Sequence, residues 1–538
     1  MEERMISNLK KHPGAASGLF LALVVLICFV LTFVFEGVGI KDLAISSAEN
    51  DELIYYYEVA GVVNYGIPQG FFGYYEVSAR TLSFGPWSPL LIINYCILGR
   101  LFGWSLTKAV FYNAFMLILA VFLFGLLARP GKYQTIFCAI ALSSYTFLMY
   151  GVFSVVPEVT CYSYSIIYLG LCYSSLRENK RYKTVIMFVL AFLLTLMRPY
   201  YAGLMIPALY FWYKRKGKRV IIPGALLTAA SVYGYFFIAV NLCAWSPVGG
   251  FADRLIPKLE LNKDNIYFLC SKVTVALLAG GGDFIRRLVH GLYATYEQLV
   301  VFFVDEVWAR NFFTFYYIFI LLVLLVILTW KKRSSGDKLT DSFLWRCFWP
   351  VYYILMTLAV ALYFSGWSAD RHLAEFVVMG ILFIAMETGE SGSRKWLFVL
   401  LELGLVYALT KVPNRERNYV SREYIDEIYA QKEKLSEIMP LTYTGEPSWD
   451  NTVFWMYEDK VDGESVIIPW RALYAVPDGY AFNMTLGDEW FDYLEEKNVK
   501  MRSKYFATVP SGDGEEWCIK NGGSKIAEYG GIVLYRLH

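Results

Sequence analysis

The sequence predicts a mainly α-helical, polytopic membrane protein that ends in a small α/β domain. Three observations support this fold class. Hydrophobic residues make up 57% of the 538 residues, and aromatic residues make up 18%. Mean hydropathy is +0.42, a value that ordinary soluble domains do not reach. After about residue 410 the long apolar runs give way to Glu, Asp, Lys and Tyr. We therefore expect a transmembrane module over residues 1–410 and a soluble domain over residues 411–538.

Charge and cysteine content exclude several other classes. The net charge is only +2, which predicts no nucleic-acid partner. Most of the nine cysteines lie inside apolar segments without CxxC spacing, and are expected to be buried small hydrophobes. Four histidines without metal-ligand spacing argue against a zinc site.

The first expected span is Leu19–Phe35, which follows the basic residues Lys10 and Lys11. About 20 apolar residues cross the hydrocarbon core, and no small-residue cleavage site follows this run. We interpret it as a retained signal anchor with a cytoplasmic N-terminus. In total we expect about 10–12 spans. The others are predicted near Leu106–Leu127, Thr135–Phe153, Val159–Leu176, Val185–Leu196, Tyr201–Tyr213, Val220–Leu242, Phe312–Trp330, Phe348–Phe364, Leu373–Met386 and Trp396–Leu409.

Two of these segments, Val185–Leu196 and Tyr201–Tyr213, are too short to be independent crossings. They flank Arg198-Pro199, and proline prevents a continuous helix. We expect a broken pair that rises toward the outer face and returns.

Basic residues predict the orientation, because short cytoplasmic loops are enriched in Lys and Arg. Five basic loops fall on the side of the N-terminus: Arg129–Lys132, Arg177–Lys183, Lys214–Arg219, Lys331–Lys338 and Ser393–Lys395. The first outer loop, about residues 37–105, then lies outside the cytoplasm together with the C-terminal domain. Its aromatic and short apolar pieces predict helices that lie along the membrane interface.

The C-terminal domain alternates two kinds of pattern. Helical periodicity covers Ser421–Met439 and Leu486–Asn498. Short β-like runs are expected at Thr452–Tyr457, Ser465–Ile468, Tyr505–Thr508 and Gly531–Tyr535.

The most informative local feature is the acidic run Glu49-Asn50-Asp51-Glu52 in the first outer loop, just before Tyr55-Tyr56-Tyr57. Carboxylates held against a bilayer are costly, which favours a functional role. The structural alternative is that they begin an interfacial helix near Leu53, since negative charge stabilises a helix N-terminus.

Several motifs in this order resemble the GT-C superfamily of membrane glycosyltransferases. They are DELIYYYEVAGVVNYGIPQGFFGYYE, WSPLLIINYCILGRLFGWS, VVPEVTCYSYSIIYLGLCYSSL, LTLMRPYYAGLMIP and SGWSADRHL. The resemblance covers roughly residues 15–410 and implies a GT-C-like bundle. Similar enzymes include protein O-mannosyltransferases, aminoarabinose transferases and bacterial cell-envelope glycosyltransferases. The soluble tail resembles that of some bacterial members, which implies a bacterial plasma membrane.

The resemblance and the chemistry of sugar transfer assign roles to residues on the outer face. Transfer from a lipid-linked phosphate needs a base at the acceptor and positive charge at the leaving phosphate. Asp51 is expected to be the base, with Glu52 sharing that role or binding the acceptor. Glu158 is expected to bind the acceptor or a metal, or else to be an N-terminal helix charge after Pro157.

The donor phosphate is expected to contact Arg198, Arg371 and His372, because a guanidinium offers phosphate a planar set of donors. Arg371 has a structural alternative in pairing with Asp370 or Glu375. His372 has one as an interfacial residue. Arg198 has no acidic partner nearby in sequence. No cofactor is certain; a divalent ion held by Asp51 and Glu158 fits the ligand types.

The predicted function is an inverting transfer of a sugar from a polyprenyl-phosphate carrier to a glycan, lipid or protein of the cell envelope. The alternatives are a lipid-linked-glycan flippase or other transporter, and a polysaccharide polymerase or ligase. A transporter predicts charges throughout the depth of the spans, whereas here they gather at the outer boundary.

Overall fold

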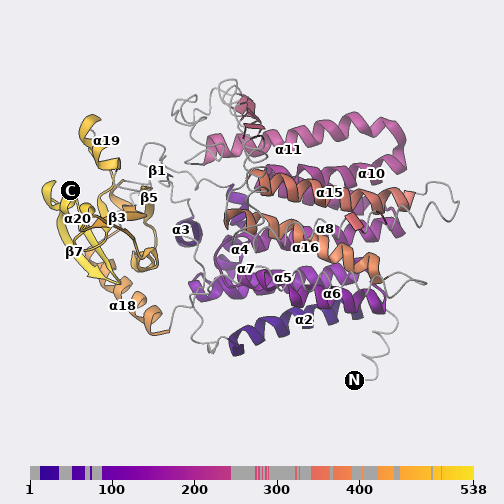
Figure 1. Cartoon of the computed structure of the whole chain (residues 1–538), viewed down its shortest axis with the longest axis horizontal. Coiled ribbons are helices and arrows are strands. Elements are labelled where there is room, and N and C mark those ends of the chain that lie inside the picture. The colour runs from indigo at the N-terminus through magenta and orange to yellow at the C-terminus, as the bar shows by residue number, and fades with distance from the viewer. Residues whose placement is uncertain are drawn as a thin grey trace, which may run out of the picture.

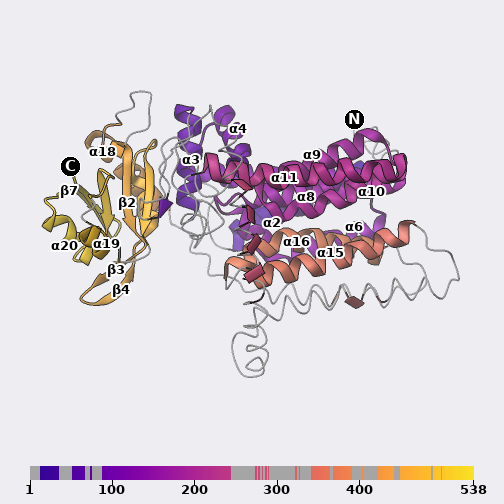
Figure 2. The same ribbon diagram turned by 90° about the horizontal axis from the view of Figure 1, so that it is seen from above.

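A computed structural model shows a helical bundle and a separate sheet domain, with two short helices between them (Figure 1). It describes residues 13–35, 51–66, 73–74, 88–243, 341–363, 367–389, 422–441, 449–485, 489–497 and 500–538, with isolated positions elsewhere. The view from above shows the same order, in which α3 (Asp51–Tyr65) and α4 (Ile93–Phe102) lie between the sheet and the bundle (Figure 2).

The bundle confirms the mainly helical prediction. Its helices are α2 (Pro13–Phe35), α5 (Leu106–Ala128), α6 (Lys132–Ser144), α7 (Thr146–Val152), α8 (Glu158–Arg177), α9 (Arg181–Met197), α10 (Met205–Lys216), α11 (Ile221–Leu242), α15 (Asp341–Tyr363) and α16 (Trp367–Gly389). Three helical stretches of the described chain are long and apolar enough to cross a membrane: Pro13–Val34, Leu106–Ala128 and Pro199–Ala239. The chain is therefore an integral membrane protein. The spans expected at 312–330 and 396–409 lie outside the described residues.

Two predicted segments differ in their continuity. The expected span Thr135–Phe153 is interrupted at Tyr145, where φ is −88° and ψ is 83°, so that α6 ends and α7 begins. The expected break at Arg198-Pro199 is confirmed. Arg198 is extended, with φ −149° and ψ 126°, and the 3₁₀ helix η3 (Pro199–Leu204) follows it. A residue before proline is disfavoured in the helical region, which accounts for the break.

Small residues allow α2 and α5 to pack closely. Gly14 and Gly18 lie one turn apart on α2, and a Cβ on Gly18 would collide with the backbone of Phe122. A Cβ on Gly125 of α5 would likewise collide with Gly18. The Ser17 hydroxyl donates to the Pro130 carbonyl at 3.2 Å. This small-residue contact is typical of helix pairs in membranes, where backbones approach closely.

The chain between α2 and α5 includes α3, β1 (Gly73–Tyr74), η2 (Pro89–Leu91) and α4. Helix α3 is buried on nearly all sides, as expected for a helix enclosed between two other layers. On one side the Trp104 indole N–H donates to the Tyr56 carbonyl at 3.0 Å. On the other side the Tyr57 hydroxyl donates to the carbonyls of Leu473 and Val476 at 3.0 and 2.5 Å. Helix α3 thus joins the bundle to the C-terminal domain.

The C-terminal domain is α/β, as predicted. Its helices are α18 (Arg422–Ile438), α19 (Glu489–Lys497) and α20 (Asp513–Lys520), with short 3₁₀ turns η5 (Trp449–Asn451) and η6 (Trp470–Ala475). Its strands are β2 (Thr452–Met456), β3 (Glu458–Val461), β4 (Glu464–Ile467), β5 (Ala481–Thr485), β6 (Tyr505–Thr508), β7 (Ser524–Tyr529) and β8 (Ile532–Arg536). The larger sheet has the order β1-β5-β2-β6-β8-β7, parallel from β1 to β6 and antiparallel from there to β7.

Strand β1 comes from the chain between α2 and α5, yet it extends the sheet of the C-terminal domain. Gly73 pairs with Asn483 and Tyr74 with Met484, in parallel. The sheet of the C-terminal domain therefore includes a strand from outside residues 411–538. Sequence analysis did not predict β1, β3, β5, β7 or α20.

Candidate functional site

The candidate site is built around Arg198, the extended residue between α9 and η3. Three other elements bring polar side chains to it. Glu158 begins α8, Tyr200 and Tyr201 belong to η3, and His372 and Glu375 lie in the second and third turns of α16. Because α8 and α9 run in opposite directions, the start of α8 and the end of α9 meet at the same end of the bundle. We call these six residues the Arg198 cluster.

Arg198 is bound by two carboxylates. Its Nη2 lies 2.6 Å from Glu158 Oε1, and its Nη1 lies 3.7 Å from Glu375 Oε1. The same Nη1 donates to the Tyr200 hydroxyl at 3.0 Å and contacts His372 Nδ1. The guanidinium is therefore held by α8, η3 and α16 together.

Glu375 is the second centre of the cluster. The Tyr200 hydroxyl donates to its Oε2 at 2.9 Å, and the Tyr201 hydroxyl donates to the same oxygen. Two hydroxyls and a guanidinium thus surround a carboxylate that is fully buried. Hydrogen bonds to an ionised group are among the strongest in proteins, so this arrangement fixes Glu375 firmly.

The cluster is mostly buried, with Tyr200 half-buried. Glu158 and Glu375 are 0% exposed, His372 is 4% exposed and Arg198 is 7% exposed. Burying a charge is costly unless a partner compensates for it. A concentration of ionisable groups at one end of a membrane bundle is therefore a candidate site for a charged ligand.

Tyr95 on α4 reaches the segment that leads into α8. Its hydroxyl donates to Asn113 Oδ1 at 2.5 Å and to the Val156 carbonyl at 3.1 Å. Burial raises the pKa of Tyr95, and the charges of Glu158 and Glu52 raise it further. The Tyr95 hydroxyl thus ties α4 to α5 and to the segment before Glu158.

The two carboxylates of the acidic run differ in their surroundings. Asp51 is half-buried and begins α3, whereas Glu52 is 0% exposed. The charge of Glu52 adds to the effect of burial in raising the pKa of Tyr474 in η6. Glu52 is thus enclosed between α4 and the C-terminal domain. Both carboxylates also lie in the first helical turn, so the helix-end interpretation remains compatible with the fold.

The remaining predicted residues fall partly outside the described chain. Arg371 lies in α16, but its side chain is outside the described part, as is all of Glu49. His372 is in the Arg198 cluster. Among the described residues no group of three His, Cys, Asp or Glu side chains could hold a metal ion. A divalent ion between Asp51 and Glu158 stays a prediction.

Sequence reasoning missed three members of the cluster. Glu375 was considered only as a partner for Arg371, and Tyr200 and Tyr201 were not considered at all. The available signal was the Arg-Pro-Tyr-Tyr sequence itself, since hydroxyls beside an arginine can share its partners. The lack of an acidic residue near Arg198 in sequence was misleading, because Glu158 and Glu375 reach it from other helices.

A second buried polar group lies at the opposite end of α16. Arg346 Nε is 3.0 Å from Glu387 Oε2, and the Tyr173 hydroxyl donates to Glu387 Oε1 at 3.3 Å. Glu375 and Glu387 are separated by about 18 Å along the helix, at 1.5 Å per residue. Glu375 and Glu387 therefore lie in different halves of α16, and an apolar stretch separates them.

Comparison with known proteins gives a limited result. No protein-family model matches the chain, and no curated protein matches its sequence. The chain aligns with the crystal structure of ArnT from Cupriavidus metallidurans bound to undecaprenyl phosphate, over 96% of this chain and 97% of that one. The identity is 11% and the TM-score is 0.40. A likeness at this level assigns neither a substrate nor residue roles to this chain.

Proposed function

We propose that this protein is a membrane glycosyltransferase that moves a sugar from a polyprenyl-phosphate carrier to an acceptor hydroxyl, with inversion at the sugar carbon. The acceptor would be a glycan, lipid or protein of the cell envelope on the extracytoplasmic face. The observation that carries the proposal is the buried Arg198 cluster, in which a cation and two carboxylates meet. It supplies both a cation for a leaving phosphate and carboxylates for an acceptor within one end of the bundle.

In this proposal Asp51 is the base that takes the proton of the acceptor hydroxyl. Glu52 shares that role or orients the acceptor, and Glu158 binds the acceptor or a divalent ion. Positioned acid–base groups contribute about 10²–10⁴-fold to rate. The half-buried position of Asp51 supports the assignment, because it leaves the carboxylate reachable from outside the cluster.

The donor phosphate would bind Arg198, Arg371 and His372. Because Glu158 and Glu375 already hold Arg198, an incoming phosphate would share or replace one of these contacts. An incoming phosphate that replaces one carboxylate keeps an anion on the buried guanidinium, which limits the cost to Arg198 of losing that contact.

The test is reconstitution in liposomes with a panel of radiolabelled polyprenyl-phosphate sugars, followed by analysis of the anomeric configuration of the product. We expect transfer by the parent and losses of at least about 10²-fold in Asp51→Asn and Arg198→Ala. Glu437→Gln, on the exposed side of α18, is the control and should transfer normally.

Full transfer by Asp51→Asn would defeat the base assignment. Movement of the labelled lipid without a glycosidic product would favour a transporter, and a repeating product would favour a polymerase.

A further inference from the structure

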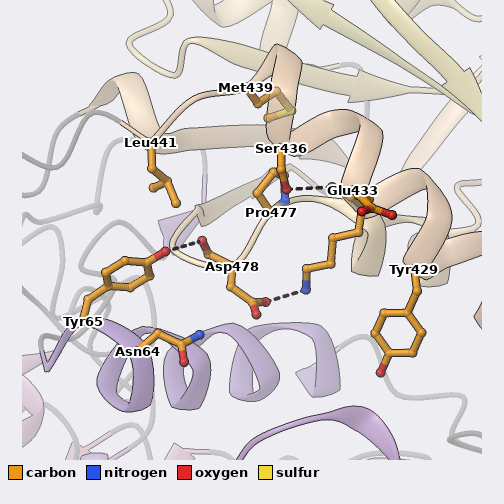
Figure 3. A pocket seen from close by; sticks show the side chains of 10 residues that line it. Asn64, Tyr65, Tyr429, Glu433, Ser436, Met439, Leu441, Pro477 and Asp478 are labelled. Carbon is orange, nitrogen blue, oxygen red and sulfur yellow. Dashed lines mark hydrogen bonds and ion pairs between the residues drawn. The ribbon is translucent and has the colours of Figure 1, made fainter.

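A pocket of about 450 Å³ lies between the end of α3 and the C-terminal domain (Figure 3). Asn64 and Tyr65 of α3 form one wall, and Tyr429, Glu433 and Ser436 of α18 form another. The volume is within the roughly 300–1,000 Å³ that is usual for small-molecule sites. The pocket shares no lining residue with the Arg198 cluster. It is also distant from the acidic pair, because Asn64 is about 18 Å from Glu52 along α3 at 1.5 Å per residue.

Asp478 organises the polar part of the pocket. Its carboxylate lies 2.5 Å from Lys432 Nζ, and its carbonyl accepts from the Tyr65 hydroxyl at 3.2 Å. In Figure 3 Tyr65 and Tyr429 lie on opposite sides of Asp478. The pocket therefore combines two phenol rings with a carboxylate, an ammonium and the amide of Asn64. Aromatic faces pack against the C–H faces of sugars, and such polar groups hydrogen-bond to their hydroxyls.

The charges of the lining select against anions. Lys432 is the cation among the lining residues, and its charge is matched by Asp478. Glu433 adds an exposed carboxylate at the rim. The lining thus carries one more negative than positive charge, which favours a neutral or amino-bearing ligand and disfavours a phosphate. This excludes the pocket as a site for the phosphate of a lipid carrier.

We propose that this pocket is a saccharide-binding subsite, which holds the distal sugars of an extended glycan acceptor whose reacting hydroxyl lies at Asp51 and Glu52. The acceptor role rests on the proposed glycosyl transfer, whereas saccharide binding does not. Helix α3 forms one wall of the pocket with its last turn and carries the acidic pair on its first.

The binding test uses the full chain in lipid nanodiscs and saturation-transfer NMR with four neutral or amino tetrasaccharides. These are cellotetraose, mannotetraose, N-acetylchitotetraose and deacetylated chitotetraose, and tetragalacturonate is the anionic comparison. Ser436→Trp fills the pocket from an exposed position, and the adjacent exposed Glu437→Trp does not line it. We expect at least one of the four to bind the parent and Glu437→Trp equally, and to bind Ser436→Trp at least tenfold more weakly.

Several results would overturn the inference: binding of none of the four, equal binding by Ser436→Trp, or stronger binding of tetragalacturonate. If the two tryptophan variants have equal melting temperatures, a lost binding signal in Ser436→Trp is not caused by unfolding. In the transfer assay, Ser436→Trp should raise KM for an extended acceptor and leave kcat unchanged. If no donor supports transfer while the saccharide still binds, the glycosyltransferase proposal fails and the saccharide subsite stands. If transfer occurs and no saccharide binds, only the subsite fails.

Discussion

Arg198 holds the end of α9 against the start of α8 by its contact with Glu158, with Nη2 and Oε1 at 2.6 Å. Both side chains are buried, so removal of either leaves the buried charges of the cluster less well compensated. Each of Arg198→Met and Glu158→Gln should lower the free energy of unfolding by about 3–5 kcal/mol.

A double-mutant cycle separates this pairing from the other contacts of the two residues. The double variant should lose less stability than the sum of the single variants, because it removes both charges together. Urea unfolding in detergent micelles, followed by tryptophan fluorescence, measures all four proteins. Additive losses would show that the two charges do not stabilise each other.

The sequence predicts the helices around this contact better than the contact itself. The expected Val159–Leu176 is observed as Glu158–Arg177, and Val220–Leu242 as Ile221–Leu242, because length and apolar character identify a helix in a membrane. The partners of Arg198 could not be predicted in this way. Sequence spacing indicates contacts within one helix, whereas Glu158 and Glu375 approach from other helices.

The C-terminal domain shows the same limit. Strand β6 was expected at Tyr505–Thr508 and is observed there. Strand β1 has only two residues and pairs with β5, some 400 positions later in the chain. A run this short has no detectable alternation, so its addition to the sheet could not be predicted.

Gly18 permits the close approach of α2 to α5, and a larger side chain should separate the two helices. A Cβ at this position would collide with the Phe122 carbonyl, which is backbone and cannot move aside easily. Gly18→Leu should cost about 1–3 kcal/mol or more of stability, seen as a lower melting temperature in detergent. Gly131→Ala is the control, because its Cβ would have only Gln134 Oε1 nearby, at 3.5 Å. Equal melting temperatures of the two variants would contradict this account of the packing.

Lys432 joins the C-terminal domain to α3 by two kinds of contact. Its ammonium pairs with Asp478 and lies 5.2 and 5.5 Å from the ring centroids of Tyr56 and Tyr57. Lys432→Met keeps the apolar stem and removes the charge, so we expect a loss of about 1–2 kcal/mol at this joint. Hydrogen exchange of residues 470–478 should become faster, while the exposed Lys434→Met leaves it unchanged. Unchanged exchange in Lys432→Met would show that the charge is not needed for docking.

Asp459 predicts a pH dependence in the C-terminal domain. Burial raises the pKa of its carboxyl, although hydrogen bonds from the Thr508 hydroxyl and the Lys460 and Gly514 N–H groups partly oppose this. Because the pKa of Asp459 is raised in the folded state, its contribution to stability is complete below the unfolded-state pKa of about 3.9. That contribution is lost as pH rises through the folded-state pKa. Hydrogen exchange of residues 505–520, corrected for intrinsic rates, should therefore report easier local opening as pH rises from about 4.

Asp459→Asn should remove this trend, whereas Asp462→Asn in the exposed β3–β4 turn should keep it, since asparagine tolerates the φ of 52° there. Opening that becomes harder with rising pH, to the same extent in both variants, would contradict the assignment to Asp459.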